Sequence, residues 1–393
     1  RGLIVPAIAG IALALGFLGW SRFERANRPP VGMDFFREPP GQLLRIRIAP
    51  DNLGRLRAAP REWVQAEVRG AADHWTDVRL RLKGHGSFQN IDAKPNFTLD
   101  FDQGRERPLP TGIGRLHLNN SAEDESHMNE MIASELFNRA GVPSPRVTHA
   151  VVQLNGRRLG LYVVKEGFGP AFLCRHFGSP SGALLEPAPG HDVDGTLRLQ
   201  SGEDSPELRA LLNALQTTLN EPDGSARLDQ LRRTLDWDRF VTLVAMETIT
   251  GHWDGYAIGK NNFRLYHDPA RQRLVFLPAG LDQLFGNDRF PVQPDMAGQV
   301  ARAVMETSDG SREIEARVRL LVDQVLDPDE IHRRIQERVG QLRPHLGWVE
   351  WRALRNQARE QSRRVAARAE FLRRAFTTAA TGEDPRDSRS FAR

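Results

Sequence analysis

A short stretch in the second half of the chain carries acidic and amide side chains at a spacing that could bring them together. Asp254 and the pair Asn261 and Asn262 come shortly before a predicted β-hairpin, and Asp282 follows it. The two ends of a hairpin lie side by side, so these side chains should converge. Carboxylate and amide oxygens bind hard cations such as Mg²⁺, and a carboxylate can orient an attacking hydroxyl. The spacing therefore indicates a magnesium-dependent phosphoryl-transfer site, although Asp and Asn also favour ordinary turns and helix caps.

The elements that would position these side chains can be read on either side of them. Two apolar runs, residues 263–266 and 274–277, flank the turn-forming residues 267–269 and predict the hairpin. Helical periodicity begins at Pro206 and leads up to the loop that holds Asp254. Residues 311–376 are again helical and rich in Arg, which is typical of charged helix faces with i,i+4 ion pairs.

The first half of the chain alternates predicted strands around one helix. A strand runs into the glycine-rich residues 83–87 and a second strand starts at Pro95, a pattern that can let backbone N–H groups approach a phosphate. Lys94 and Lys83 could supply charge there, although glycine serves ordinary turns more often. The helix that follows contains Glu130 and Glu135, which are either solvated or paired with Lys94.

Composition excludes several classes of protein. The chain has 393 residues, 40% apolar and 26% charged, as expected for one large or two ordinary globular domains. A formal charge of +4 and the lack of a basic block with aromatics argue against nucleic-acid binding. The single cysteine, Cys174, excludes an intramolecular disulfide and a cysteine-cluster zinc site.

Lysine is rare, which makes its positions informative. Of 54 basic residues only four are lysine, and all lie in the motif stretches: Lys83, Lys94, Lys165 and Lys260. A chain that uses Arg nearly everywhere is expected to keep Lys where a compact ammonium is needed.

The N-terminus predicts a membrane anchor. Residues 3–20 contain no charge and can just span a bilayer, with Trp20 at the interface. Arginines flank both sides of this segment, so its orientation stays open. The predicted organisation comprises an anchor and flank (1–28), a Pro/Gly-rich linker (29–41), an N-terminal α+β lobe (42–177), a strand-poor insertion (178–205), a C-terminal helical lobe with the hairpin (206–376) and a disordered tail (377–393).

Taken together, the motifs resemble the CotH family of atypical protein kinases, which is named for a spore-coat protein. The resemblance rests on these segments in order: RLKGHGSF with KPNFTLDF, LNNSAEDESHMNEMIASELFNRAGVPSPR, VQLNGRRLGLYVVKE, HWDGY, NNFRLY, FLPAGLDQLFG and the final RAEFL. It spans roughly residues 43–376. It implies a divergent kinase-like fold of two lobes that uses ATP with Mg²⁺ or Mn²⁺ and phosphorylates Ser or Thr of a protein partner.

The resemblance also implies roles for individual residues. Asp254 takes the place of the catalytic aspartate, and Asn262 and Asp282 take the places of the metal ligands. Lys94 takes the place of the phosphate-binding lysine. Glu130 or Glu135 would pair with that lysine, and Glu166 would lie where the lobes join.

One departure from the family pattern keeps a second hypothesis open. The family usually reads Trp-Asp-x-Asp where this chain has Ala279-Gly280-Leu281-Asp282, so the first acid is replaced by Gly280. The chain is therefore expected to be either a membrane-anchored protein kinase or a kinase-like scaffold with weak or no activity.

Overall fold

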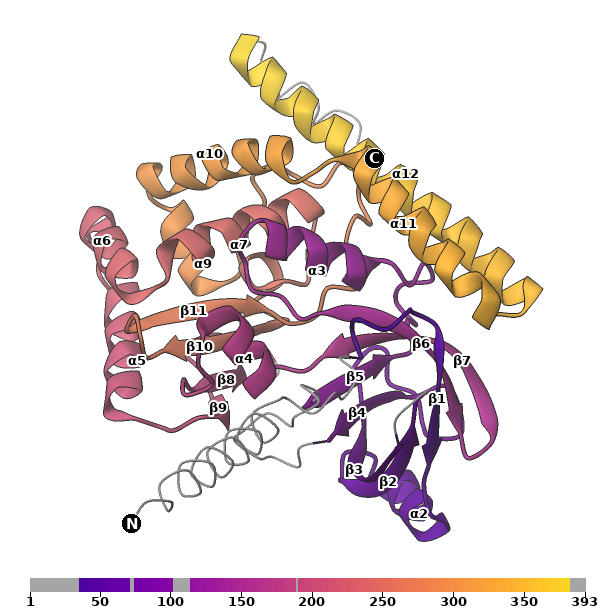
Figure 1. The fold of residues 1–393 in the computed structure, drawn as a ribbon. Helices are drawn as coiled ribbons and strands as arrows, with labels where there is room; N and C mark the ends of the chain where they lie inside the picture. Colours follow the sequence, from indigo (N-terminus) through magenta and orange to yellow (C-terminus); the bar gives the residue numbers. More distant parts are fainter. Residues whose placement is uncertain (1–34, 71–73, 102–113, 189, 382–393) are drawn as a thin grey trace, which may run out of the picture.

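The computed structural model describes residues 35–70, 74–101, 114–188 and 190–381 (Figure 1). The predicted anchor at residues 3–20 and residues 382–393 of the predicted tail lie outside these ranges. None of the helices within them is long and apolar enough to cross a membrane.

The N-terminal part is a closed barrel, here called the barrel part. Its strands follow each other around the barrel in the order β1-β2-β3-β4-β5-β7-β6, with β1 parallel to β6 and the other pairs antiparallel. The elements are β1 (Gln42–Arg47), α2 (Pro50–Ala58), β2 (Val64–Arg69), β3 (His74–Lys83), β4 (Asn96–Asp100), β5 (Arg115–Asn119), α3 (Asn129–Arg139), β6 (Val147–Leu154) and β7 (Arg157–Glu166).

Alternation along the strands decides which side chains face outward. On β3, Leu80 and Leu82 are buried inside the barrel while Arg81 and Lys83 point out of it. The predicted hairpin turn at Asn155-Gly156 is confirmed between β6 and β7. Asn155 there has φ 46°, a left-handed conformation that Asn tolerates well.

The second part combines a small sheet with helices and is called the helical part. Its sheet has the order β11-β10-β8-β9. The elements are α4 (Pro170–Phe177), β8 (Leu184–Pro187), β9 (Leu197–Ser201), α5 (Pro206–Leu219), α6 (Gly224–Thr234), α7 (Trp237–Thr250), α8 (Tyr256–Gly259), β10 (Phe263–Asp268), β11 (Arg273–Pro278), α9 (Gln299–Met305), α10 (Ser308–Gln324), α11 (Pro328–Leu342), η1 (Arg343–His345) and α12 (Trp348–Thr381).

Two predictions about this part were wrong. Residues 178–205 were expected to be poor in strands, yet β8 and β9 lie there and β8 pairs with β10. The short apolar pair Leu184-Leu185 is buried by this pairing, which neighbouring Pro, Gly and Asp residues concealed in the sequence. The tail was expected to lose its structure at residue 377, whereas α12 continues to Thr381.

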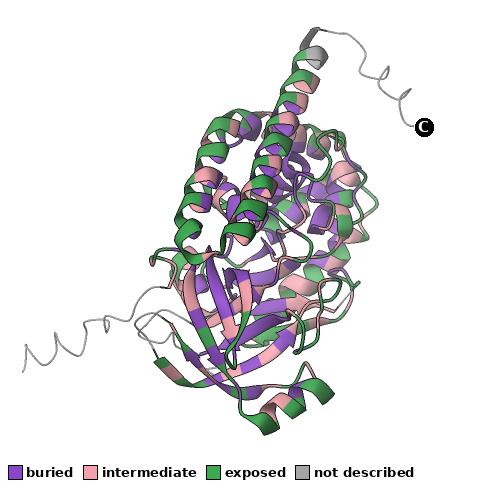
Figure 2. Cartoon of the chain, turned by 90° about the vertical axis from the view of Figure 1, so that its right-hand side faces the viewer, coloured by how far each residue is buried: buried purple, intermediate pink, exposed green. Residues whose placement is uncertain are grey.

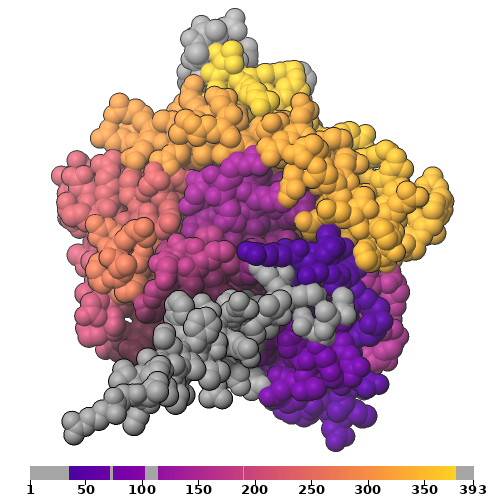
Figure 3. Space-filling view, in the orientation of Figure 1, coloured from indigo at the N-terminus to yellow at the C-terminus, as the bar shows by residue number. Residues whose placement is uncertain are grey.

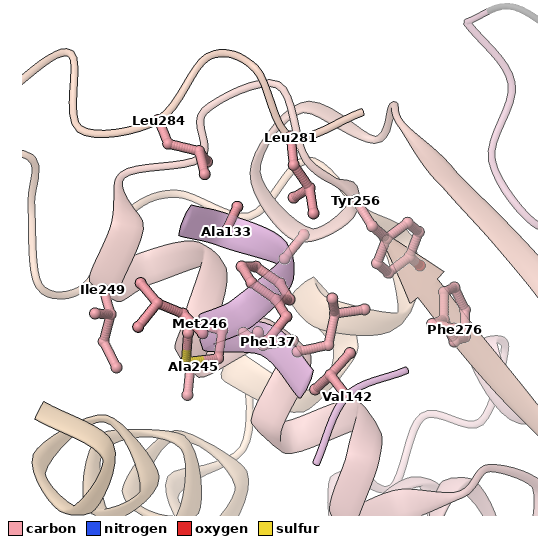
Figure 4. Close-up of a cluster of buried hydrophobic side chains, with 14 of the residues drawn as sticks. Ala133, Phe137, Val142, Ala245, Met246, Ile249, Tyr256, Phe276, Leu281 and Leu284 are labelled. Atoms are coloured by element: carbon pink, nitrogen blue, oxygen red, sulfur yellow. The ribbon is translucent and has the colours of Figure 1, made fainter. Parts of the chain in front are cut away.

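The helix α3 belongs to the barrel part in sequence but packs into the core of the helical part. Its residues Ala133 and Phe137 face Ala245 and Met246 of α7, and other buried apolar side chains surround them (Figure 4). Burial is continuous from the barrel into the helices (Figure 2). In the space-filling view the purple segment that includes α3 lies between the barrel and the orange helices (Figure 3). The α+β class, with the sheet first and the helices later, is therefore confirmed, and α3 joins the two parts.

Candidate functional site

The loop before β10 brings together the first three predicted site residues. The carboxylate of half-buried Asp254 accepts a hydrogen bond from Asn261 Nδ2 at 3.0 Å and one from Asn262 Nδ2 at 2.6 Å. Asn262 has φ 46°, which is left-handed and suits Asn. The two amides thus fix one carboxylate at the open end of the hairpin.

A buried acid supports the loop of Asp254 through hydrogen bonds to its backbone. Glu247, near the end of α7, accepts hydrogen bonds from the backbone N–H groups of Tyr256 at 2.9 Å and Ala257 at 2.7 Å. Burial raises the pKa of Glu247 to about 8, against the two hydrogen bonds, which lower it. Glu247 therefore acts as a support for the loop of Asp254, a role that the sequence analysis did not assign.

An arginine from α12 binds the end of α7, directly before the loop of Asp254. Arg368 of α12 is buried and donates to the carbonyl oxygens of Ile249 at 2.9 Å and Thr248 at 2.7 Å, at the end of α7. It also donates to the carbonyl oxygens of Asp288 and Phe290. Burial lowers its pKa to about 10. A cation at a helix C-terminus satisfies carbonyls that the helix leaves unpaired.

The segment after β11 is fixed by α3. Asn129 Nδ2 donates to the carbonyl oxygen of Asp282 at 2.7 Å. The N–H of Leu281 donates to Glu130 Oε1 at 3.4 Å. Asp124, buried before α3, accepts the N–H of Asn129 at 2.9 Å and so sets the start of that helix. The position of Asp282 thus depends on an element that comes 150 residues earlier in the sequence, and neither Asn129 nor Asp124 was singled out from it.

Two lysines are linked to one buried carboxylate beside this segment, Lys165 directly and Lys83 through the Asn119 amide. Lys165 Nζ donates to Glu130 Oε1 and to the carbonyl oxygen of Ala279, both at 2.6 Å. Asn119 donates to Glu130 Oε2 at 2.8 Å and accepts a hydrogen bond from Lys83 Nζ. The outer faces of β3, β5 and β7 therefore meet α3 in a network of four polar side chains.

The charges in this network shift each other's pKa. Burial and then the neighbouring charge of Lys165 together lower the pKa of Lys83 to about 8. Burial would raise the pKa of Glu130, but Lys165 outweighs it and the net pKa is lowered. The pKa of Asp282 rises to about 6, because of burial and then the charge of Glu130, although Lys165 opposes the rise. Asp282 is thus electrostatically part of the lysine network.

The family model of the CotH kinase protein matches residues 80–369, which is most of the chain. The chain belongs to the CotH kinase family. Among curated proteins it is 23% identical to the invasin CotH2 of Rhizopus delemar over 59% of this chain, and 25% identical to the invasin CotH3 of that fungus over 43%. It is also 23% identical over 45% of its length to the inner spore coat protein H of Bacillus subtilis.

The relatives are longer than the matched region. The chain covers 44%, 31% and 51% of these three proteins, about half of their length or less. Among solved structures, the Helicobacter pylori proinflammatory kinase CtkA aligns over 71% of this chain and 94% of its own, with 9% identity and a TM-score of 0.33. A score of this size establishes neither a common fold nor a common site.

In this CotH family member the lysine that pairs with the acid of α3 is not Lys94, which was expected from the sequence. Glu130 pairs with Lys165, and Glu135 pairs with Arg334 of α11 at 2.6 Å, so the expected ion pair with Lys94 is wrong. Lys94 instead places its ammonium 5.2 Å from the ring centroid of Tyr162. The strand register explains the difference: Lys165 projects outward from β7 toward α3, a direction that spacing alone did not give. The rarity of lysine was the signal that could have found it.

Glu166 lies at the end of β7, where the barrel leads into α4. Its carboxylate receives hydrogen bonds from Arg146 at 3.0 Å and Arg175 at 2.8 Å. Burial would raise the pKa of Glu166, but the two arginines lower it overall. The carboxylate is therefore engaged in joining the barrel to α4, and a direct contact with a nucleotide stays a prediction.

Gly280 leaves room for the site asparagine. A Cβ atom at position 280 would lie 2.5 Å from Asn262 Oδ1, closer than any normal contact. The backbone N–H of Ala279 also donates to the carbonyl oxygen of Asn262 at 2.7 Å. An acid at position 280 could enter only if the Asn262 amide moved, so the departure from the family pattern and the position of Asn262 are coupled.

The residues present suit phosphate better than a metal held by protein alone. Lys165 is paired with Glu130, whereas Lys83 is bonded to the neutral Asn119 amide, so positive charge is left for phosphate oxygens. Across the described ranges no three His, Cys, Asp or Glu side chains are arranged to hold a metal ion. Asn262 and Asp282 stay predicted ligands, and a cation held by these two side chains would need phosphate oxygens or water to complete its shell.

Proposed function

We propose that this chain is a protein kinase that transfers the γ-phosphate of ATP to a Ser or Thr hydroxyl of a protein partner. Family membership implies ATP use, and the acceptor, the cation and the catalytic roles are part of the proposal. The observation that carries it is the segment 279–282, which touches both halves of the site. Asn262 packs against Gly280, and Lys165 bonds to the carbonyl of Ala279.

The roles follow from the chemistry of each side chain. Lys165 and Lys83 bind phosphate oxygens and stabilise the charge that develops during transfer. Asp254 orients the acceptor hydroxyl and takes its proton as the oxygen bonds to the γ-phosphorus, while the bond from that phosphorus to ADP breaks. Asn262 and Asp282 would hold Mg²⁺ or Mn²⁺, which neutralises phosphate charge when bound.

The location is also a proposal. The uncharged segment 3–20 would tether the kinase to a membrane, and its partner would be a protein found at that membrane. Proteolysis of sealed vesicles that carry the full chain would test the tether. A chain removed by a carbonate wash would contradict it.

A second candidate is a kinase-like scaffold that binds a partner without transferring phosphate. Gly280 favours it, because the chain offers a single acid, Asp282, after the hairpin. The scaffold would bind nucleotide, or would not, but it would transfer no phosphate.

Incubation of the full chain with labelled ATP and Mg²⁺ or Mn²⁺ separates the two candidates. Transfer of label by the parent chain but not by Asp282→Ala supports the kinase. Stabilisation by nucleotide without transfer supports the scaffold. No response to nucleotide in either assay would overturn ATP binding in this cleft.

A further inference from the structure

Beyond the lysine pair, four arginines from the barrel part and the small sheet lie close enough for their charges to act on one another. Arg81 and Arg115 project from the outer faces of β3 and β5, and Arg264 and Arg198 come from β10 and β9. We call these four residues the basic cluster. The proposed transfer reaction uses none of them.

The basic cluster holds more positive than negative charge. Arg264 and Arg198 share one carboxylate, Glu186 of β8, at 2.5 and 3.2 Å. Arg115 reaches Asp100 at 3.7 Å, and Asp100 is already bonded by Arg79.

Arg81 is the least compensated member. Its guanidinium lies 4.6 Å from the ring centroid of Trp63 and forms no ion pair with any acid in the part of the chain that the structure describes. Arg81 is half-buried, and its pKa is lowered by burial first and by the charge of Arg115 next. Buried like charges are relieved by an anion between them, and guanidinium forks suit tetrahedral oxyanions.

The position and the space around the cluster also suit a ligand. Arg81 precedes Lys83 by two residues on the same side of β3, about 7 Å along the strand. Arg115 also lines a cavity of about 780 Å³, together with Ser201 and His267. His267 is buried, and its Nε2 has no hydrogen-bond partner among the described residues. An anion held by Arg115 would therefore have room beside it for an organic group.

We propose that the basic cluster is a second oxyanion subsite of the cleft, which binds a phosphate group beyond the one held by Lys83 and Lys165. The phosphate could belong to the far end of the nucleotide's own chain or to a separate phosphomonoester, such as a phosphorylated side chain of the acceptor protein. Both sources present the same chemistry to the guanidinium groups. The subsite depends on neither Asp254 nor transfer activity.

Calorimetric titration of the full chain in detergent with O-phospho-L-serine and with inorganic phosphate tests the subsite. The variant Arg81→Gln should weaken binding about 10-fold or more, as expected for loss of a charge-assisted donor. Arg57→Gln is the control, because Arg57 of α2 is an exposed arginine of the same part that pairs with Asp92 at 2.8 Å and does not belong to the basic cluster. It should change binding by less than about 2-fold. Lys165→Met should retain binding at the cluster.

The outcomes are distinguishable. Binding that Arg81→Gln leaves unchanged, or that Lys165→Met alone abolishes, would overturn the subsite, as would no binding by the parent chain. If Arg81→Gln does not fold, Arg81→Lys replaces it, because lysine keeps the charge but loses the planar guanidinium. Arg81→Lys should bind with intermediate affinity. An affinity equal to that of the parent chain would count against the subsite. Saturating ATP then identifies the source. Phosphoserine that still binds indicates a separate phosphomonoester, whereas displacement together with weaker ATP binding by Arg81→Gln indicates the nucleotide.

Discussion

Asp254 and Lys165 are both linked to Ala279, the first through Asn262 and the second directly, and the protein holds them by different means. The loop of Asp254 is fixed through its backbone, by Glu247 at the N–H groups of Tyr256 and Ala257 and by Arg368 at the end of α7. Lys165 is fixed through its side chain, by an ion pair with Glu130 inside a buried network.

The supports of the Asp254 loop set its position, whereas the supports of Lys165 also set the charges around it. Support through the backbone leaves the Asp254 carboxylate half-buried and open to a substrate. The buried lysine network instead couples each charge to the others, so one change there alters several pKa values. Substitutions on the two sides should therefore fail in different ways.

Asp254→Asn should give the largest effect, and on turnover alone. Loss of the carboxylate that orients the hydroxyl should lower kcat about 1000-fold, or about 4 kcal/mol. Stability should change by less than about 0.5 kcal/mol, because the side chain is half-buried and bonded to two amides that an Asn can still partly meet. Label transfer measures the change in kcat, and thermal unfolding measures the change in stability. An unfolded variant would show that Asp254 is structural.

Arg368→Ala should lower the free energy of unfolding by about 3 kcal/mol or more. Four carbonyl groups lose a buried charged donor, and a bond to a charged group is worth about 1.5–3 kcal/mol. Denaturant unfolding measures the loss, with Arg363→Ala as the control, because exposed Arg363 of the same helix pairs only with Glu360 at 2.6 Å. Arg363→Ala should lower the free energy of unfolding by less than about 1 kcal/mol. Equal losses in the two variants would remove Arg368 from the support of the loop.

Lys165→Met should weaken the response to nucleotide and lower kcat/KM about 100-fold, near 2.7 kcal/mol, because Lys83 is left as the phosphate-binding ammonium. Lys94→Met should change neither, since Lys94 stacks on Tyr162 away from Glu130. Thermal shifts with ATP and initial rates, measured for both variants, would test this ranking of the two lysines. The opposite ranking would restore the role expected for Lys94 from the family resemblance.

Glu247 should give the smallest effect, a dependence of stability on pH. Its pKa is about 8 in the folded chain and 4.5 ordinarily, so the folded state binds more protons and stability falls as pH rises between these values. The limit is about 1.4 kcal/mol per pH unit. Lys83, with a pKa of about 8, titrates at the upper end of this range. His252, whose pKa falls from 6.5 to about 4, gives stability the opposite dependence on pH up to its ordinary value. The contribution of Glu247 is therefore the difference between the parent chain and Glu247→Gln.

Between about pH 6.5 and 8, the slope of stability against pH should be more negative in the parent chain than in Glu247→Gln. The matched variant Glu135→Gln alters an acid on the surface of α3 and should keep the slope of the parent chain. Equal slopes in the parent chain and in Glu247→Gln would place the proton elsewhere.

The same contrast explains what could be predicted from the sequence. The contact of Asp254 with Asn262 could be predicted because both lie at one end of the hairpin, which is a local rule, whereas the roles of Asp254, Asn262 and Asp282 stay predictions. The partner of Glu130 was missed because the choice between Lys94 and Lys165 depends on how β7 meets α3, a tertiary contact without a local signature. Glu247 and Arg368 were missed as supports because their partners are backbone groups, which every residue carries. The strands β8 and β9 were missed because pairing with β10, rather than their own composition, stabilises them.

The bond from Arg368 to Ile249 links residues 119 apart. During synthesis at about 5–20 residues per second, the loop of Asp254 would leave the ribosome roughly 6–24 s before the arginine that secures it. Until α12 docks, the end of α7 and the residues around Asp288 lack their shared donor. The arrangement around Asp254 is thus secured only after α12 has been made and has docked, which is later than the loop itself.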